Sequence, residues 1–165
     1  MYEKSIDLLN RAVADELYAI HQYMYFHFHC DQKGYDLLSG LFKKTAIEEM
    51  QHIERIAERI LFLKGDVNIK TSEDVKKIHD VKEMLIFSRK MEEQSIKDYN
   101  RFVMECASNA DSISKKLFED LVGDEERHYD QFDIEFENLE KFGQNYLALQ
   151  SIERSKNTAM GTAQD

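Results

Sequence analysis

Four glutamates and two histidines recur along the chain with a duplicated spacing. The first half contains Glu16 and the run Glu49-Met50-Gln51-His52, and the second half contains Glu92 and the run Glu125-Glu126-Arg127-His128. The counterparts lie 76 positions apart: 16 and 92, 49 and 125, 52 and 128. One Glu from each of two helices, with a Glu-x-x-His from each of two others, can bind two metal ions inside a four-helix bundle. The duplicated spacing therefore predicts a dinuclear metal centre.

Other acidic residues adjoin these glutamates and offer competing registers, namely Asp15, Glu48, Glu93 and Glu126. The offset of 76 selects the three pairs given above, and no shifted set keeps all three pairs on the apolar faces of the expected helices. We therefore expect the four neighbouring acids to be solvated or to contact the metal-binding residues from outside.

The types of these side chains indicate which metal they bind. Four buried carboxylates without counter-charge cost many kcal/mol, so they bind protons or cations. Two divalent cations balance the four carboxylates when both histidines are neutral. Carboxylate and imidazole ligands without a thiolate favour iron or manganese over structural zinc. Iron fits best, because two adjacent Fe(II) ions can together deliver two electrons to O2 or peroxide.

Four long helices must position these residues. Apolar side chains recur at steps of three and four over the segments 6–30, 38–63, 85–106 and 118–142, a spacing typical of helices with one buried face. Proline, which interrupts helices, is absent from the chain. The candidate metal-binding residues lie on the apolar stripes near the middle of each helix. The sequence therefore predicts one compact all-α domain.

The connections between these segments predict the topology. Gly34 separates the first two helices, and the last two are also joined by few residues, so each pair should form an antiparallel hairpin. Residues 65–80 form a longer connection. When extended it reaches about 53 Å, which exceeds the roughly 42 Å length of a 28-residue helix. One long crossover therefore makes the second and third helices parallel, as in ferritin-like folds.

Several residues mark where the helices end. We expect Asp80, followed by Glu83, to cap the third helix and Asp111 to cap the fourth. Gly65 is expected to end the second helix in a left-handed conformation, and Gly143 to end the fourth. After Gly143, residues 145–152 predict a short fifth helix. Residues 154–165 are small and polar, which predicts a frayed tail after a domain spanning 1–153.

Composition excludes several kinds of partner and location. The net charge is −10 and no block of Lys or Arg occurs, so binding to a nucleic-acid backbone is electrostatically opposed. No apolar run approaches the roughly 20 residues that span a membrane. The chain starts with an amphipathic pattern and without a secretory hydrophobic region. Two cysteines do not make a disulfide framework, and we expect a reduced, cytoplasmic protein.

The chain resembles bacterioferritin, a haem-associated branch of the ferritin superfamily, from the first helix to the fifth. The similarity is densest in these runs: Asp15 to Tyr23, Glu48-Glu49-Met50-Gln51-His52, Glu58 to Gly65, Asp124-Glu125-Glu126-Arg127-His128 and Gln144-Asn145-Tyr146-Leu147. The resemblance implies that one iron is held by Glu16 and His52 and the other by Glu92 and His128. It further implies that Glu49 and Glu125 bridge the two ions.

The same resemblance implies an activity and an assembly. Fe(II) would be oxidised by O2 or H2O2 at this ferroxidase centre, and ferric mineral would accumulate inside a hollow homo-oligomeric cage that protects against oxidative stress. Met50 matches the haem ligand of bacterioferritin, where two subunits each contribute one methionine to haem b at a two-fold interface; a thioether can serve as an axial ligand. It can equally pack at a dimer interface without haem.

Three further positions bear on the resemblance. Tyr23 matches a family tyrosine close to the di-iron centre, and Tyr99 repeats it at the offset of 76; either can hydrogen-bond a ligand, supply an electron, or simply be a core tyrosine. Lys44 stands where bacterioferritins often have a histidine on the inner surface that assists iron passage. The resemblance therefore does not predict the route by which iron reaches the cavity.

The two cysteines raise the question of which relative this chain is. Thioferritins, a Dps-like group, combine a bacterioferritin-type site with cysteines and build a cage of 12 subunits, whereas the expected fifth helix favours 24. Cys30 and Cys106 lie fourteen residues beyond Glu16 and Glu92 on helices that run in opposite directions. They should lie at opposite ends of the bundle, some 40 Å apart at 1.5 Å per residue. We expect two buried thiols and no disulfide.

Other functions compete with iron storage. A rubrerythrin-like peroxidase usually adds a Cys-x-x-Cys module, and the chain contains none. A Dps-like protein that coats DNA would need a basic terminal arm, which is also missing. A Dps-like cage that uses mainly H2O2 remains an alternative. A metal-free structural bundle would not account for the repeated ligand set.

Overall fold

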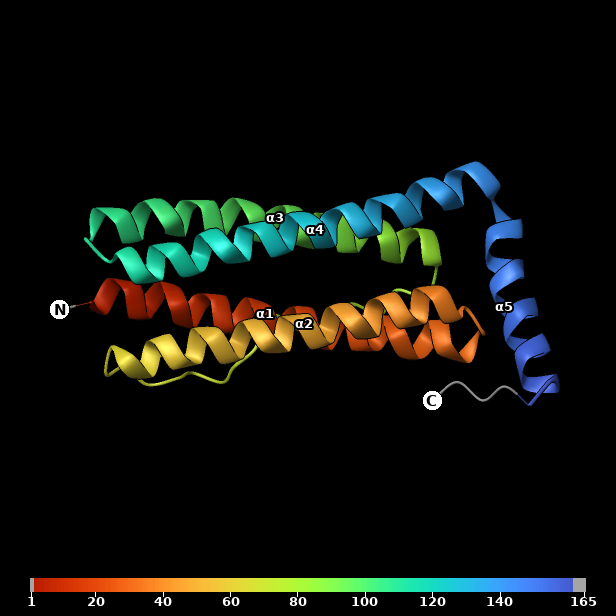
Figure 1. Cartoon of the computed structure of the whole chain (residues 1–165), viewed down its shortest axis with the longest axis horizontal. Helices are drawn as coiled ribbons and strands as arrows, with labels where there is room; N and C mark the ends of the chain where they lie inside the picture. Colours follow the sequence, from red (N-terminus) through yellow and green to blue (C-terminus); the bar gives the residue numbers. More distant parts are fainter. Residues whose placement is uncertain (1, 162–165) are drawn as a thin grey trace.

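The computed structural model describes residues 2–161 and contains five helices in that range. Four of them, α1 to α4, form a long bundle, and α5 lies across one end of it (Figure 1). The helices are α1 Glu3–Gln32, α2 Asp36–Phe62, α3 Val81–Ser108, α4 Ser112–Phe142 and α5 Gln144–Ala159. The expected ferritin-like four-helix bundle with a C-terminal fifth helix is therefore confirmed.

The helices pack as two hairpins joined by one long crossover. α1 packs mainly against α2, and α3 mainly against α4. The crossover, residues 63–80, runs back along the bundle (Figure 1). Asn10 of α1 accepts a hydrogen bond from Asn68 N (2.8 Å), and the Gln22 amide exchanges hydrogen bonds with the backbone of Lys76 (3.0 and 2.8 Å). Polar side chains of α1 thus hold the crossover along its length.

Two aspartates cap the helices where the sequence predicts it. Asp80 accepts a hydrogen bond from Glu83 N at the start of α3 (3.0 Å), and Asp111 accepts one from Ser114 N at the start of α4 (3.1 Å). Each side chain satisfies a backbone N–H that the first helical turn leaves without a partner. Gly143, with φ of 58°, ends α4 as expected.

The end of α2 differs from the prediction. The left-handed residue is Lys64 (φ 64°) and not Gly65. Lys64 N and Gly65 N donate to Leu61 O and Ile60 O, both at 3.0 Å, which is the Schellman arrangement. Gly65 serves another purpose, because a Cβ there would lie 2.7 Å from Ile6 Cγ2. The glycine lets the crossover pass close to α1.

The fifth helix is longer than expected and continues to Ala159 instead of ending near residue 152. Ser151 Oγ donates to Lys33 O (2.9 Å), and the Arg154 guanidinium hydrogen-bonds Asp31 and lies 3.4 Å from an Asp36 carboxylate oxygen. These contacts with the α1–α2 turn hold residues that the sequence alone assigned to a frayed tail. The last positions of that tail, 162–165, lie outside the described residues.

The buried apolar side chains form two clusters, one toward each end of the bundle. The first includes Phe26, Phe42 and Cys30, and the second includes Phe102 and Cys106. Both thiols are free and buried, and burial raises the pKa of Cys30 to about 12 and that of Cys106 to about 11. The prediction of two separate buried cysteines is confirmed. Among the described residues, no helix is long and apolar enough to cross a bilayer.

Candidate metal centre

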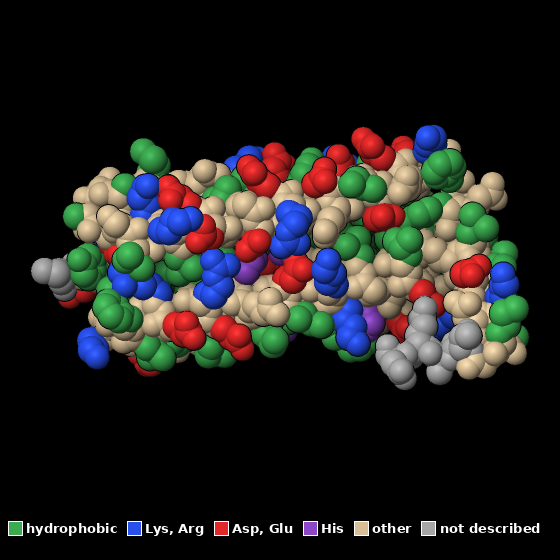
Figure 2. Space-filling view, in the orientation of Figure 1, with side chains coloured by type: hydrophobic (Ala, Val, Ile, Leu, Met, Phe, Trp, Pro, Cys, Tyr) green, Lys and Arg blue, Asp and Glu red, His purple; other side chains and the backbone are tan. Residues whose placement is uncertain are grey.

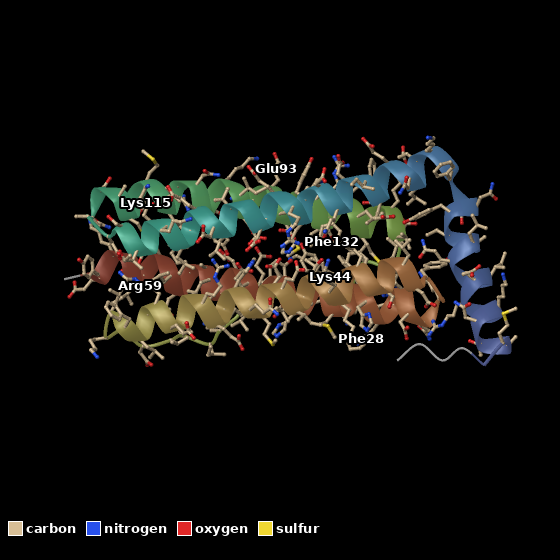
Figure 3. All side chains as sticks on the ribbon, in the orientation of Figure 1. Phe28, Lys44, Arg59, Glu93, Lys115 and Phe132 are labelled. Atoms are coloured by element: carbon tan, nitrogen blue, oxygen red, sulfur yellow. The ribbon has the colours of Figure 1, made fainter. Side chains whose placement is uncertain are left out.

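The six predicted metal-binding residues meet between the two apolar clusters, where polar side chains fill the middle of the bundle (Figure 3). All six are at most 3% exposed. They form two overlapping groups, in each of which the candidate ligand atoms lie within 4.8 Å of one another. Glu49 and Glu125 belong to both groups. The groups are Glu16, Glu49, His52, Glu125 and Glu49, Glu92, Glu125, His128.

The two shared glutamates each extend one oxygen toward each histidine. Glu49 Oε2 lies 2.8 Å from His52 Nδ1, and its Oε1 lies 3.2 Å from His128 Nδ1. Glu125 Oε1 lies 3.4 Å from His52 Nδ1, and its Oε2 lies 3.0 Å from His128 Nδ1. The other two glutamates face one histidine each: Glu16 Oε1 is 3.3 Å from His52 Nδ1 and Glu92 Oε2 is 3.9 Å from His128 Nδ1.

Hydrogen bonds alone cannot satisfy this cluster. Each Nδ1 faces oxygens from three carboxylates but carries at most one hydrogen. Glu49 Oε2 and Glu125 Oε1 are buried near His52 Nδ1, but neither oxygen accepts a hydrogen bond of acceptable geometry. Burial, together with the charges of neighbouring carboxylates, raises the pKa of both shared glutamates to about 7. The donor set therefore fits a pair of divalent cations, whose charge would replace protons.

The same carboxylates also shift the pKa values of the two histidines, and they favour the charged form of each ring. Burial alone would lower their pKa values, but the surrounding glutamates outweigh it and raise the pKa of His128 to about 12 and that of His52 likewise upward. Without cations, the surrounding glutamates therefore favour the charged form of each imidazole, with hydrogen on both ring nitrogens. Cation binding requires release of one of these protons, because an imidazole binds metals in its neutral form.

Two tyrosines extend the duplication and bond across the bundle. Tyr23 of α1 donates a hydrogen bond to Glu92 of α3, and Tyr99 of α3 donates one to Glu16 of α1 (2.6 Å). Burial and the nearby carboxylates raise the pKa of both phenols well above 10. Both tyrosines therefore stay protonated and keep donating at neutral pH.

Two acidic side chains contact the outward nitrogens of the histidines. Glu48 Oε2 lies 2.6 Å from His128 Nε2, and Asp124 Oδ2 lies 3.2 Å from His52 Nε2. The structure confirms the outer position expected for Glu48, but the sequence analysis missed Asp124. The offset of 76 also separates positions 48 and 124 and could have identified the residue.

The remaining candidates lie away from the centre. Glu93 and Glu126 are exposed, as expected. Met50 is 48% exposed on the outside of α2 and does not approach the buried cluster. Lys44, also exposed, lies 3.8 Å from Glu48. These positions do not take part in the buried ligand set.

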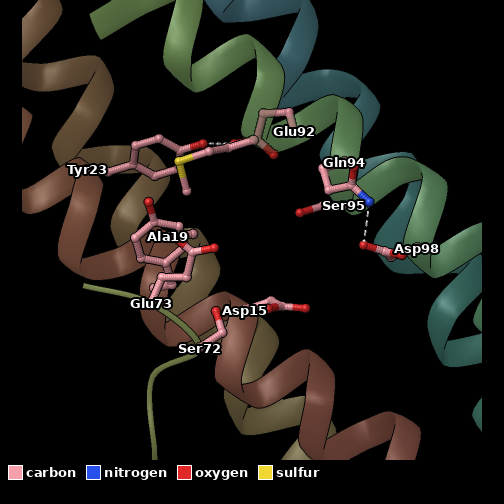
Figure 4. A pocket seen from close by; sticks show the side chains of 11 residues that line it. Asp15, Ala19, Tyr23, Ser72, Glu73, Glu92, Gln94, Ser95 and Asp98 are labelled. Atoms are coloured by element: carbon pink, nitrogen blue, oxygen red, sulfur yellow. Dashed lines mark hydrogen bonds between the residues drawn. The ribbon is translucent and has the colours of Figure 1, made fainter. Parts of the chain in front are cut away.

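A cavity of about 150 Å³ connects the centre to the surface between α1, α3 and the crossover (Figure 4). Glu92 and Tyr23 line its inner part. Asp15, Glu73 and Asp98 add three further carboxylates to its walls. Burial raises the pKa of Asp15, although a hydrogen bond to Ser72 opposes the shift. Together with Glu92, four carboxylates thus line this one cavity.

The fold and the site define a ferritin-like protein with a buried carboxylate–histidine centre of dinuclear type. Residues 6–142 match the family of ferritin-like domains. The bacterioferritin of Desulfovibrio desulfuricans is 33% identical over 145 residues, which are 88% of this chain and 81% of that protein. The Brucella melitensis bacterioferritin is 33% identical over 141 residues, covering 86% and 88%.

A solved structure shows the same architecture. The crystal structure of the Desulfovibrio desulfuricans bacterioferritin superposes with a TM-score of 0.88 at 32% identity, covering 90% of this chain and 86% of that one. Its description refers to a diiron site in different catalytic states. The chain belongs to the bacterioferritin family.

Proposed function

We propose that this protein is a ferroxidase that oxidises Fe(II) and stores ferric iron as mineral inside a hollow homo-oligomeric cage. The observation that carries this function is the pair of overlapping four-residue groups that share Glu49 and Glu125. Two Fe(II) ions held there would supply one electron each. Together with two protons, the two electrons would reduce O2 to H2O2, or H2O2 to two molecules of water.

The geometry supports one assignment of the six side chains. Glu16 and His52 would hold one iron, and Glu92 and His128 would hold the other. Glu49 and Glu125 would serve both ions, since each directs one oxygen toward each histidine. With two divalent ions and neutral histidines, the four carboxylates are balanced. The hydrogen bonds from Tyr23 and Tyr99 orient the two terminal glutamates, and Tyr23 is our candidate for an additional electron donor.

The cage and its location rest on family membership and on the surface of the subunit. Apolar side chains are exposed on α5 and on the adjoining ends of α2 and α4, among them Leu37, Phe142, Leu149 and Ile152. Such side chains are commonly buried between subunits. We propose a cage of 24 subunits in the cytoplasm, with a cage of 12 as the Dps-like alternative. The two cages differ twofold in particle mass, which light scattering measures.

Haem b is a separate proposal that rests on Met50. Its thioether is exposed near Ile47 on the outer face of α2, where a second subunit could present its own methionine. The purified protein should then show a visible haem absorption band that Met50→Leu abolishes. If protein expressed with a supply of haem shows no such band after purification, the assignment of Met50 is wrong. This result would leave the proposed metal centre unaffected.

The ferroxidase function is tested on metal-depleted protein. Wild-type protein should oxidise many Fe(II) ions per subunit and keep them in solution. Glu49→Ala and His128→Ala should abolish the fast phase of oxidation, because each removes a ligand. Unchanged fast oxidation in either variant would show that the centre is elsewhere. Parallel reactions with O2 and H2O2 separate the ferritin-like mode from the Dps-like mode.

A further inference from the structure

The outward nitrogens of the two histidines are linked by a bridge of polar side chains. Glu48 contacts His128 Nε2 and Asp124 contacts His52 Nε2, at 2.6 and 3.2 Å. Arg127 joins the two acids: its Nη1 donates to Glu48 (2.9 Å) and its Nη2 donates to Asp124 (3.2 Å). The bridge therefore runs from the histidine of α4 to the histidine of α2 without a break.

This bridge determines which nitrogen of each ring faces inward with a lone pair. A neutral imidazole carries a single N–H, and a carboxylate can only accept a hydrogen bond. Glu48 and Asp124 therefore favour the tautomer with hydrogen on Nε2, which leaves Nδ1 free to bind a cation. In each ring Nδ1 is the atom that faces three of the four buried glutamates.

One arginine serves both halves of an otherwise duplicated site. The acids at 48 and 124 follow the offset of 76, but the counterpart of Arg127 is Gln51. A guanidinium presents N–H groups in a planar fork and can hold two carboxylates at once, whereas a lysine ammonium acts as a point charge. Arg127 also places one positive charge between the two negative charges of Glu48 and Asp124.

Other cations lie on the same side of the centre. Arg55 donates to the Asp124 oxygen that faces His52 (3.3 Å), and Lys44 lies near Glu48. Basic side chains are visible over the middle of the face formed by α2 and α4, beside a histidine (Figure 2). The acidic cavity opens between α1, α3 and the crossover instead. The α2–α4 side of the centre thus carries basic side chains paired with acidic ones, whereas the charged side chains that line the cavity are all acidic.

We propose that Arg127 is a positioning residue that holds Glu48 and Asp124 against the two histidines, so that both halves of the centre bind divalent cations. This role rests on the proposed dinuclear centre. It does not require Arg127 to touch a metal ion or a reactant.

Equilibrium binding of Co(II) to the metal-depleted cage tests this role without turnover. Isothermal titration calorimetry measures affinity and stoichiometry, and the visible spectrum of bound Co(II) reports its coordination. Arg127→Gln should weaken Co(II) binding about 10-fold and alter the spectrum, as expected when outer hydrogen-bond partners of metal-binding histidines are disturbed. Arg127→Lys should recover only part of the affinity, because it cannot hold both acids.

Arg101→Gln is the matched control. Arg101 is also an exposed helical arginine beside two acids, Asp98 and Glu105, and its removal changes the charge equally. If Arg127→Gln and Arg101→Gln had the same affinity for Co(II) and the same Co(II) spectrum, the proposed role of Arg127 would be overturned. A wild-type protein that binds no Co(II) would instead contradict the dinuclear centre itself.

Conservative changes of the two acids provide a second measurement. Glu48→Gln should weaken mainly the half that contains His128, and Asp124→Asn mainly the half that contains His52. Combining Arg127→Gln with Glu48→Gln should cost less than the sum of the single effects, because both act through His128. Strictly additive losses would show that Arg127 acts independently of Glu48 and would overturn the bridge.

Discussion

Tyr99 on α3 donates a hydrogen bond to Glu16 on α1, and the two residues belong to different hairpins of the bundle. Its repeat counterpart, Tyr23 on α1, donates to Glu92 on α3. Each tyrosine therefore orients the terminal glutamate of the opposite half. The duplicated tyrosines thus form two equivalent hydrogen bonds between the hairpins, and these bonds connect the two halves of the centre.

Removal of one tyrosine hydroxyl should affect the centre more than the fold. Tyr99→Phe keeps the ring packed against Phe102 and Phe118 but removes the hydrogen bond to Glu16. A hydrogen bond to a charged group contributes about 1.5–3 kcal/mol, so we expect Fe(II) to bind about 10-fold more weakly to the half containing Glu16. Stopped-flow oxidation at varied Fe(II) concentration measures the effect. Tyr25→Phe, outside the centre, should behave as wild type; equal behaviour of both variants would contradict an orienting role for Tyr99.

The metal-free protein should lose stability as the pH rises. Glu49 has a folded pKa of about 7 against an ordinary value of 4.5, because of burial and the charges of Glu16 and Glu92. The folded state thus holds more protons than the unfolded chain between about pH 4.5 and 7, and stability falls across that window. The raised pKa values of His52 and His128 act in the same direction, since the stability they provide is full below their ordinary pKa and declines at higher pH.

Glu49→Gln isolates this contribution. At pH 8 the metal-free variant should be more stable than metal-free wild type by up to about 3 kcal/mol, because the pKa rises from 4.5 to about 7 and each pKa unit corresponds to about 1.4 kcal/mol. At pH 5 the difference should largely vanish. Denaturant unfolding at both pH values measures it. A variant that is less stable than wild type at pH 8 would show that Glu49 is not under electrostatic strain in the metal-free state.

The acidic cavity should speed the arrival of cations at the centre. Asp15 and Asp98 line its walls, and carboxylates that line a cleft raise the local concentration of cations. Asp15→Asn combined with Asp98→Asn should slow the initial oxidation of Fe(II) about 3- to 10-fold at low salt, with little effect at high salt. Glu93→Gln combined with Glu126→Gln is the control, because it removes the same charge from exposed positions outside the cavity. Equal rates in the two double variants would exclude this route.

The end of α2 offers a test of backbone geometry. Gly65→Ala should destabilise the protein by about 1–3 kcal/mol, because the new methyl group would press on Ile6. Lys64→Gly should instead be neutral or stabilising by up to about 1 kcal/mol, since glycine adopts a positive φ without strain. Thermal unfolding compares the two variants. The opposite order would contradict both the close approach at Gly65 and the backbone strain at Lys64.

The sequence by itself determined the class of fold and the register of the six buried candidate metal-binding residues. Helical periodicity places a residue on the core face from local spacing alone, so the apolar stripes, taken together with the offset of 76, sufficed to separate Glu49 from Glu48 and Glu125 from Glu126. The length of residues 65–80 likewise decided the topology, because a parallel connection must span the bundle. The caps at Asp80 and Asp111 are interactions within one turn and could be predicted for the same reason.

Only the tertiary structure decided which side chains meet across the bundle. Tyr99 is 83 residues from its partner Glu16, and Glu48 is 80 residues from His128 and 79 from Arg127. These contacts therefore depend on which helices become neighbours. The length of α5 was decided in the same way, because Arg154 hydrogen-bonds Asp31 at the far end of α1. Local periodicity predicts which face of a helix is buried, but it does not predict which side chains of other helices that face contacts.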